Sequence, residues 1–214
     1  MADVVTIIDY GVGNLLSVGR AFEKFNAKVV FAHDPQAILS AEKLVLPGVG
    51  AFSSGMNGLR QLEMIEPLKA YAQTGKPLLG ICLGMQLLFT SSDEFGHTPG
   101  LDLISGKVSR ITPLSKEGLP LKVPHIGWSP MHRPALGPSW EDSIFKNLNA
   151  DPHTYFVHSY TAIPTHENER LADAQYGSAR ICAATKRGNL YGCQFHPEKS
   201  GPIGLAIVKN FIDL

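Results

Sequence analysis

The stretch LLGICLGMQLL (78–88) carries the strongest signal for the fold and raises the first question about function. An apolar run passes through Gly80 to a single cysteine, Cys82, and a helix-like apolar run resumes after Gly84. A nucleophile with a glycine two residues away on each side is typical of a sharp strand-to-helix turn. Glycine at these positions avoids a Cβ clash between closely passing backbones and tolerates unusual dihedral angles. The pattern therefore predicts a strand, a tight turn at the cysteine and a helix.

A cysteine on such a turn can serve as a nucleophile. A helix from about Met85 would place its positive end at the thiol and favour the thiolate. The amide of Leu83 would face an oxyanion formed beside the sulfur. Alternatively, Cys82 is a small buried hydrophobic residue at an ordinary strand end. The pentapeptide alone leaves both interpretations open, because a nucleophilic cysteine also needs a base.

The chain before this turn alternates between short apolar runs and longer stretches of helical periodicity. We expect strands at residues 4–9, 27–32, 43–48 and 77–82, and helices at residues 14–25, 34–40 and 53–75. The strand segments are nearly continuous apolar runs, as in parallel strands that are buried on both faces. The last helix should break near Pro67 or its glycines. This alternation predicts right-handed βαβ units in an open parallel sheet.

The second half of the chain has a different character, with many turns and shorter strand candidates from about residue 91. Three candidates follow one another too closely for crossover helices: residues 172–178, 179–185 and 189–195. KRGN (186–189) is typical of a hairpin connection, and a final helix is expected over residues 202–214. We therefore expect an α/β fold, an open mostly parallel sheet flanked by helices with an antiparallel extension in the C-terminal half, as a single domain over residues 1–214.

The composition narrows the function classes. The 214 residues are 44% hydrophobic and 18% charged, which is enough apolar material for a core and argues against disorder. Lys plus Arg and Asp plus Glu balance at 19 each, so we expect neither nucleic acid nor a membrane surface as a partner. The N-terminal MADVVTIIDYG is typical of a core strand rather than a signal peptide. Three cysteines without framework spacing favour a reducing compartment, and we expect a cytoplasmic protein.

A candidate base lies near the C-terminus, in YGCQFHPEKSGP (191–202). In an extended segment, His196 and Glu198 would face the same way, so the carboxylate could orient the imidazole while its other nitrogen handles the thiol proton. The alternative is a His-Pro turn with a solvated glutamate, and the chain has eight histidines. A G-x-C-x-G turn together with a late His-x-Glu favours a catalytic triad over chance.

With these motifs the chain resembles the class I, triad-type glutamine amidotransferases, and among them the glutaminase subunits of imidazole glycerol phosphate synthase. The turn at Cys82 and the HPE motif carry the resemblance to the superfamily. DYGVGN, PHIGW and the lysine after HPE carry the resemblance to the subunit. The matching segments span nearly the whole chain: residues 9–18, 46–52, 80–88, 123–128, 155–160 and 192–202.

The resemblance implies a role for each matching residue. Cys82 would attack the side-chain amide of glutamine, His196 would act as acid and base, and Glu198 would orient it. The backbone amides of Val49, in LPGVG, and of Leu83 would form the oxyanion hole. Taken without the resemblance, PGVG is a turn that ends a strand. No metal and no cofactor are implied.

Glutamine recognition would fall to four residues: Gly50, Gln86, Ser159 and Tyr160. Gln86 lies one helical turn past Cys82, so its amide could overhang the pocket; otherwise it is an ordinary polar helix residue. His158 is an alternative base by type, but the family gives it no catalytic role. We expect His158 to be buried and hydrogen-bonded.

Three further residues match subunit-interface positions of the family: Asn14, Trp128 and Lys199. Lys199 could form an ion pair across the interface, and Trp128 offers a large anchor of the kind enriched at interface hot spots. The alternatives are a helix N-cap for Asn14, a core position for Trp128 and a solvated side chain for Lys199.

The resemblance implies that the ammonia released from glutamine passes to a separate (β/α)₈-barrel cyclase subunit in a heterodimer. There it would be used to make imidazole glycerol phosphate and aminoimidazole carboxamide ribotide in histidine biosynthesis. If the Val49 amide points away when the cyclase is not bound, activity should be very low until the liganded cyclase shifts that strand.

Three alternatives remain open. The chain could be a glutaminase subunit that feeds another synthase, such as one making anthranilate, aminodeoxychorismate or pyridoxal phosphate. It could be a stand-alone cysteine hydrolase of γ-glutamyl bonds, which would be active without a partner. A non-catalytic interaction subunit is disfavoured by the intact Cys82, His196 and Glu198.

Overall fold

The parallel half of the central sheet is built from the predicted apolar runs. In the computed structural model, which describes residues 3–214, β1 (Val4–Ile8), β2 (Lys28–Ala32), β3 (Lys43–Gly48) and β4 (Leu78–Cys82) pair in parallel in the order β2-β1-β3-β4. Every residue of β4 is buried, as expected for a strand covered on both faces. The C-terminal ends of β3 and β4 lie side by side, which positions the turn that follows each.

The predicted antiparallel extension continues the same nine-stranded sheet. β13 (Leu190–Cys193) pairs in parallel with β4, and the strands beyond it are antiparallel: β12 (Ala179–Arg187), β11 (Arg170–Tyr176), β8 (His125–His132) and β9 (His153–His158). The hairpin expected at residues 186–189 connects β12 to β13. The expectation of a mixed α/β sheet is therefore confirmed.

A second, four-stranded sheet was not expected from the sequence. Its order is β10 (Tyr160–Pro164), β7 (Ile104–Arg110), β5 (Phe89–Ser92) and β6 (Thr98–Pro99). β5 and β6 are only four and two residues long, which is too short for a periodic pattern to reveal. β10 begins two residues after the end of β9, and its first residue, Tyr160, lines the site described below.

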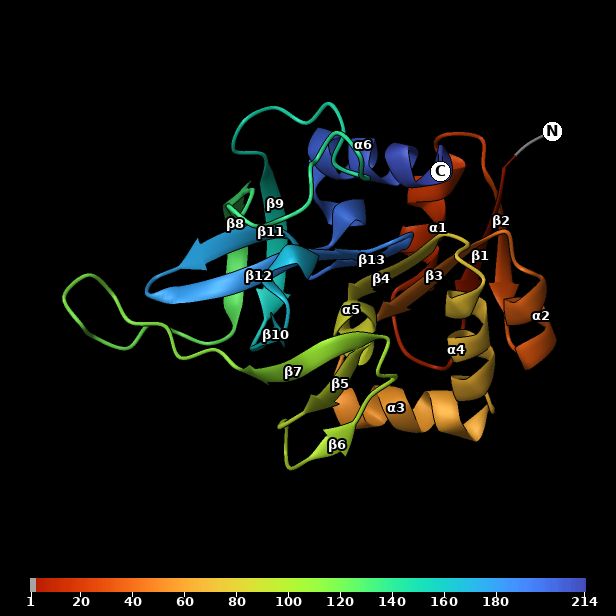
Figure 1. The fold of residues 1–214 in the computed structure, drawn as a ribbon, viewed down its shortest axis with the longest axis horizontal. Helices are drawn as coiled ribbons and strands as arrows, with labels where there is room; N and C mark the ends of the chain where they lie inside the picture. The colour runs from red at the N-terminus through yellow and green to blue at the C-terminus, as the bar shows by residue number, and fades with distance from the viewer. Residues whose placement is uncertain (1–2) are drawn as a thin grey trace.

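Helices cover both faces of the large sheet (Figure 1). α1 (Leu15–Glu23) and α6 (Gly201–Ile212) pack together on one face, where Phe22 and Phe211 meet edge to face. The other face carries the remaining α-helices: α2 (Pro35–Ser40), α3 (Phe52–Gln61), α4 (Ile65–Gln73) and α5 (Leu83–Leu87). Each face has its own cluster of buried apolar side chains. Two short 3₁₀ turns complete the chain: η1 (Glu167–Glu169) and η2 (Pro197–Lys199).

Two predicted helix boundaries are corrected by the structure. The helix expected over residues 53–75 divides at residues 62–64, where Glu63 has a φ of +55°, and Pro67 lies inside the first turn of α4. A proline is tolerated there because the first turn has no intrahelical acceptor for its missing N–H. The helix expected from about Met85 begins at Leu83 and lasts only five residues.

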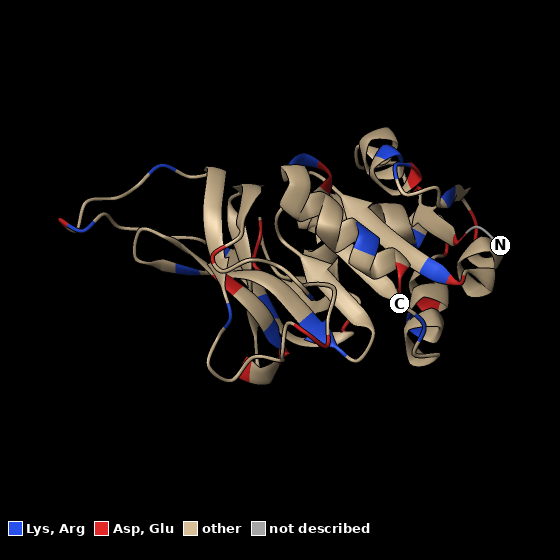
Figure 2. Ribbon diagram, turned by 90° about the horizontal axis from the view of Figure 1, so that it is seen from above, with Lys and Arg blue, Asp and Glu red and all other residues tan. Residues whose placement is uncertain are grey.

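Figure 2 shows charged side chains of both signs distributed over the fold, although single strands such as β12 carry basic residues alone. This agrees with the balanced composition of the chain. Among the helices within residues 3–214, none is both long and apolar enough to cross a membrane.

Candidate active site

Cys82 lies on the strained turn that its flanking glycines predict. It ends β4 and precedes α5 with φ +54° and ψ −110°, a conformation that is unusual for a residue with a side chain. A Cβ on Gly80 would come within 2.8 Å of the backbone of Gly84. A Cβ on Gly84 would overlap the carbonyl oxygen of Leu46 on the neighbouring strand. The two glycines therefore provide the clearance that lets the turn present the thiol.

His196 and Glu198 form the second part of the site. Nδ1 of His196 lies 2.8 Å from Oε1 of Glu198, and both side chains are almost completely buried. Because the carboxylate oxygen can only accept, Nδ1–H donates this hydrogen bond. The expectation that HPE is extended was wrong, since residues 197–199 form η2. The tight 3₁₀ turn still brings the carboxylate against the imidazole.

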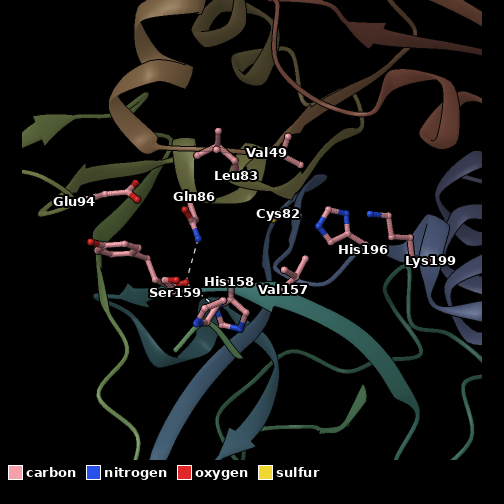
Figure 3. Close-up of a pocket in the computed structure, with 13 residues that line it drawn as sticks. Val49, Cys82, Leu83, Gln86, Glu94, Val157, His158, Ser159, His196 and Lys199 are labelled. Carbon is pink, nitrogen blue, oxygen red and sulfur yellow. Dashed lines mark hydrogen bonds between the residues drawn. The ribbon is translucent and has the colours of Figure 1, made fainter. Parts of the chain in front are cut away.

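The other imidazole nitrogen faces the cavity that also exposes the thiol. Nε2 of His196 has no hydrogen-bond partner among the described residues, and His196 lines the same pocket as Cys82 (Figure 3). Burial by itself lowers the pKa of His196, but the nearby sulfur of Cys82 and the hydrogen bond and negative charge of Glu198 outweigh it and raise this pKa to about 9. The arrangement favours a protonated imidazole on the wall of the pocket that Cys82 also lines.

The cavity has a volume of about 400 Å³, which suits a small polar molecule. Figure 3 shows His196 and Lys199 on one side of it and Gln86 and Glu94 on the other. Nearly all of the residues expected to bind or process a substrate line it: Val49, Gly50, Cys82, Leu83, Gln86, Ser159, Tyr160 and His196. Glu198 lies behind His196, and Lys199 is on the wall beside it.

Two residues of the site were missed from the sequence. Glu94, in the turn between β5 and β6, is buried and accepts a hydrogen bond from the backbone N–H of Phe52 at 2.7 Å. It therefore caps the first turn of α3 from a distant loop and lines the pocket. Gln194 is completely buried, with Nε2 3.9 Å from Sγ of Cys82. The only feature of the sequence that could have pointed to Gln194 is its position two residues before His196.

Gln86 connects several of these groups. Its Nε2 donates to the backbone carbonyl of Tyr160 at 3.1 Å and to Oε1 of Gln194 at 2.9 Å. In Figure 3 the side chain points across the pocket toward the segment of Ser159. One helical turn separates Gln86 from Cys82, as the sequence predicted, because α5 begins directly after the cysteine.

His158 is buried and hydrogen-bonded, as expected. Its Nδ1 lies 2.8 Å from the carbonyl oxygen of Tyr160, and its Nε2 lies 3.1 Å from Nδ1 of His125. Burial lowers the pKa of both imidazoles to about 4, so both are neutral near pH 7. His158 is thus a hydrogen-bonding wall of the pocket.

These opposite shifts predict that the free energy of unfolding is greatest near pH 6.5. His125 and His158 have folded pKa values near 4, so stability is lost as the pH falls from about 6.5 towards 4 and the unfolded chain takes up protons. The folded pKa of His196, about 9, lies above its unfolded value, so its contribution is complete below about pH 6.5 and is lost as the pH rises towards 9. Urea unfolding across this range measures both limbs.

A pair of variants isolates the acid limb of this profile. His158→Asn removes one of the groups that take up a proton on unfolding. The slope of the free energy of unfolding against pH, between about pH 6.5 and 5, should therefore decrease by up to about 1.4 kcal/mol per pH unit. The same substitution at the exposed His97 should leave the profile unchanged. Equal slopes in His158→Asn and the parent would contradict the assignment.

The three predicted interface residues are placed as follows. Asn14 caps α1, its side-chain oxygen accepting from the N–H of Ser17 at 3.3 Å, so the N-cap interpretation is confirmed. Trp128 is 55% exposed on β8 and packs edge-on against Tyr155, so the core interpretation was wrong. Lys199 is exposed at the pocket.

A family model and full-length relatives both identify this chain as similar to glutamine amidotransferases. The family model for glutamine amidotransferase class-I matches residues 6–214. Imidazole glycerol phosphate synthase subunit HisH 1 of Legionella pneumophila (strain Paris) is 50% identical over 210 residues, covering 98% of this chain and 99% of the relative. The HisH subunit of Syntrophotalea carbinolica is 46% identical over 214 residues, covering 99% of this chain and 100% of the relative.

Solved structures share the fold at low sequence identity. A crystal structure of a glutamine amidotransferase superposes with a TM-score of 0.71 at 15% identity, covering 98% of this chain and 99% of that chain. The structure of PurLQS from Thermotoga maritima gives a TM-score of 0.68 at 16% identity, covering 100% of this chain and 99% of that chain. The overall fold is therefore common to chains with little sequence in common.

Proposed function

Because the chain belongs to the class I glutamine amidotransferase family, we propose that it is the glutaminase subunit of an imidazole glycerol phosphate synthase. One observation carries the chemical part of this proposal. A thiol on a strained turn shares a small cavity with an imidazole whose far nitrogen is held by a buried carboxylate. This is the nucleophile, base and orienting group that amide hydrolysis through a thioester requires.

In the proposed reaction the thiolate of Cys82 attacks the side-chain carbonyl carbon of glutamine and forms a tetrahedral oxyanion. The imidazolium of His196 gives its proton to the departing nitrogen, the C–N bond breaks, and ammonia and a glutamyl thioester result. His196, now neutral, then takes a proton from water, which attacks the thioester and releases glutamate and the thiolate. Glu198 keeps Nδ1 protonated throughout, so that Nε2 is always the nitrogen that exchanges protons.

The backbone beside the thiol provides the oxyanion hole in this proposal. Leu83 is the first residue of α5, where N–H groups lack intrahelical acceptors. Val49 directly follows β3, whose last residue, Gly48, is in register with Cys82. Gly50 has a φ of +104°, so the segment after β3 can change the direction in which a peptide N–H points.

The pocket also offers groups that suit the two ends of glutamine. Glu94 supplies a buried negative charge that would attract the α-ammonium group. The backbone and side chains of Gly50, Gln86, Ser159 and Tyr160 surround the remaining volume and would hold the α-carboxylate and the side chain. We assign substrate binding to these residues on their position and chemistry.

We further propose that the ammonia is used by a (β/α)₈-barrel cyclase bound as a second subunit. The HisH relatives are subunits of a synthase by their names, and their lengths match this chain almost completely. Trp128 supports a docking surface, since an exposed tryptophan is the kind of residue that anchors protein–protein interfaces. Asn14 and Lys199 would contribute at the same interface.

Comparing two nitrogen donors in the assembled complex tests this function. The chain mixed with a candidate cyclase and its phosphoribosyl-ribonucleotide substrate should form product with glutamine, whereas the cyclase alone should need ammonium salts. Mixing should also raise glutamine turnover at least about 10²-fold over the isolated chain, the size expected when one oxyanion donor is supplied.

Other outcomes of this comparison would redirect the assignment. Comparable glutamine turnover by the isolated chain and by the substrate-loaded complex would contradict the hypothesis that the cyclase turns the Val49 amide into the oxyanion hole. Robust hydrolysis of γ-glutamyl peptides with no complex would favour the stand-alone hydrolase. Product formation only with a different synthase would identify another ammonia-using pathway.

A further inference from the structure

One backbone carbonyl determines the orientation of a buried chain of polar side chains. The carbonyl oxygen of Tyr160 can only accept hydrogen bonds, and two side-chain nitrogens approach it. The group of Gln86 that faces it at 3.1 Å must therefore be the NH₂ end of the amide. The same argument requires that Nδ1 of His158, at 2.8 Å, carries the proton.

The orientation of Gln86 passes to Gln194. The NH₂ group of Gln86 also lies 2.9 Å from the side chain of Gln194, so the atom of Gln194 on that side must be its oxygen. The NH₂ group of Gln194 is then turned the other way, towards Sγ of Cys82 at 3.9 Å. An amide in the opposite orientation would place two NH₂ groups against each other and an oxygen lone pair against the sulfur.

The carbonyl itself is supported from the other side by a second chain of hydrogen bonds. His158 donates to it through Nδ1, so its Nε2 is unprotonated and accepts from Nδ1–H of His125 at 3.1 Å. Nε2 of His125 is in turn unprotonated and accepts from the hydroxyl of Ser129 at 2.9 Å. Both imidazoles are buried among aromatic rings, including those of Phe156 and Tyr176, which restricts their reorientation.

We propose that Gln194 is a functional residue of the glutaminase reaction, whose side-chain N–H donates to Sγ of Cys82 and stabilises the thiolate. Gln86, the Tyr160 carbonyl, His158 and His125 are positioning groups that keep this N–H, rather than the oxygen, against the sulfur. A completely buried amide gives a directed hydrogen bond without exposing the thiolate to solvent. The proposal rests on the assignment of Cys82 as the nucleophile.

The test uses an isosteric substitution that removes the donor. Gln194→Met keeps the length of the side chain, and we expect kcat for glutamine to fall about tenfold with little change in KM, because a long N–H···S contact is at the weak end of charge-assisted hydrogen bonds. The pH at which Cys82 is half alkylated by iodoacetamide should rise by about one unit, the same tenfold effect on the thiolate. Mass spectrometry of the peptide that contains Cys82 separates it from the other two cysteines.

The control is the same substitution at an exposed site. Gln61→Met, at the end of α3, should leave kcat and the alkylation profile unchanged. The other titratable groups around the thiol are the same in the parent, Gln194→Met and Gln61→Met, so a difference in the profile reports the amide. They include His196, Glu198, Tyr10, Glu94, His158 and Lys199. An unchanged profile and unchanged kcat in folded Gln194→Met would overturn the inference and leave the nucleophile assignment intact.

The positioning role is tested by a pair of variants at His158. Asparagine can place a donor where Nδ1 lies, whereas leucine cannot, and both remove the contact with His125. We expect His158→Asn to stay within about threefold of the parent in kcat, and His158→Leu to reproduce the upward shift in alkylation pH expected for Gln194→Met. Equal profiles in the two variants at matched stability would show that His158 acts only as packing.

Discussion

Cys82→Ala should abolish glutamine hydrolysis by the isolated chain and glutamine-dependent synthesis by the complex, while synthesis from ammonium salts continues. We expect a loss of at least about 10⁴-fold in kcat, as for other enzymes that lose a covalent nucleophile. No other cysteine can substitute, because Cys182 and Cys193 are completely buried and burial raises the pKa of both thiols. Release of ammonia from glutamine, followed with and without the cyclase, measures the effect.

A matched cysteine variant controls for the loss of a buried thiol. Cys182 lies in β12 and its sulfur lies 3.6 Å from the carbonyl oxygen of Ala184. Cys182→Ala should cost about 1 kcal/mol of stability through a small cavity and leave glutamine turnover within about twofold of the parent. If Cys82→Ala still used glutamine, the assignment of the nucleophile would fail, whatever the behaviour of the complex.

Gly84→Ala should damage both the fold and the site. The added Cβ would overlap the carbonyl oxygen of Leu46, which belongs to β3 and cannot retreat without disturbing the pairing of β3 with β4. We expect a loss of at least about 3 kcal/mol in the free energy of unfolding, since overpacking against backbone is among the severe mechanisms. In the fraction of Gly84→Ala that folds, we expect the turn at Cys82 to shift and glutamine turnover to fall about 10²-fold or more. Urea unfolding and turnover are measured on the same sample.

Gly19→Ala provides the control, because Gly19 is also a buried glycine that touches apolar neighbours. Its Cβ would meet nothing closer than 3.6 Å, from a side-chain carbon of Val29, and it lies inside α1. Alanine should be neutral or stabilise by up to about 1 kcal/mol, as its helix propensity exceeds that of glycine. Parental stability and parental glutamine turnover in Gly84→Ala would contradict the role given to this turn.

Much of this protein could be predicted because the relevant signals are local. Continuous apolar runs such as Leu78–Ile81 identify buried parallel strands, since a strand covered on both faces has no polar side. The two glycines around Cys82 identify the turn, since only glycine permits the backbone approach seen at Leu46. The HPE segment identifies the base and its partner even though its backbone was predicted incorrectly.

Other features depend on contacts between segments far apart in the chain. Glu94 binds the N–H of Phe52, and Gln194 reaches Gln86 across a separation of 108 residues. No periodicity or spacing reports such pairs, because each residue on its own is an ordinary polar side chain. The exposure of Trp128 likewise depends on which face of β8 is covered by elements packed on the sheet.

The sequence by itself thus determined the alternation of strands and helices in the parallel half, the strained turn, and the chemical identity of the candidate nucleophile, base and carboxylate. Only the tertiary structure decided which polar groups surround them, in which direction each amide and imidazole donates, and that a second sheet closes the pocket. The reason is physical. Backbone conformation follows from short-range sterics and burial, whereas hydrogen-bond direction in a buried network follows from its acceptor-only groups, here the carbonyl of Tyr160, and these are assembled by the fold.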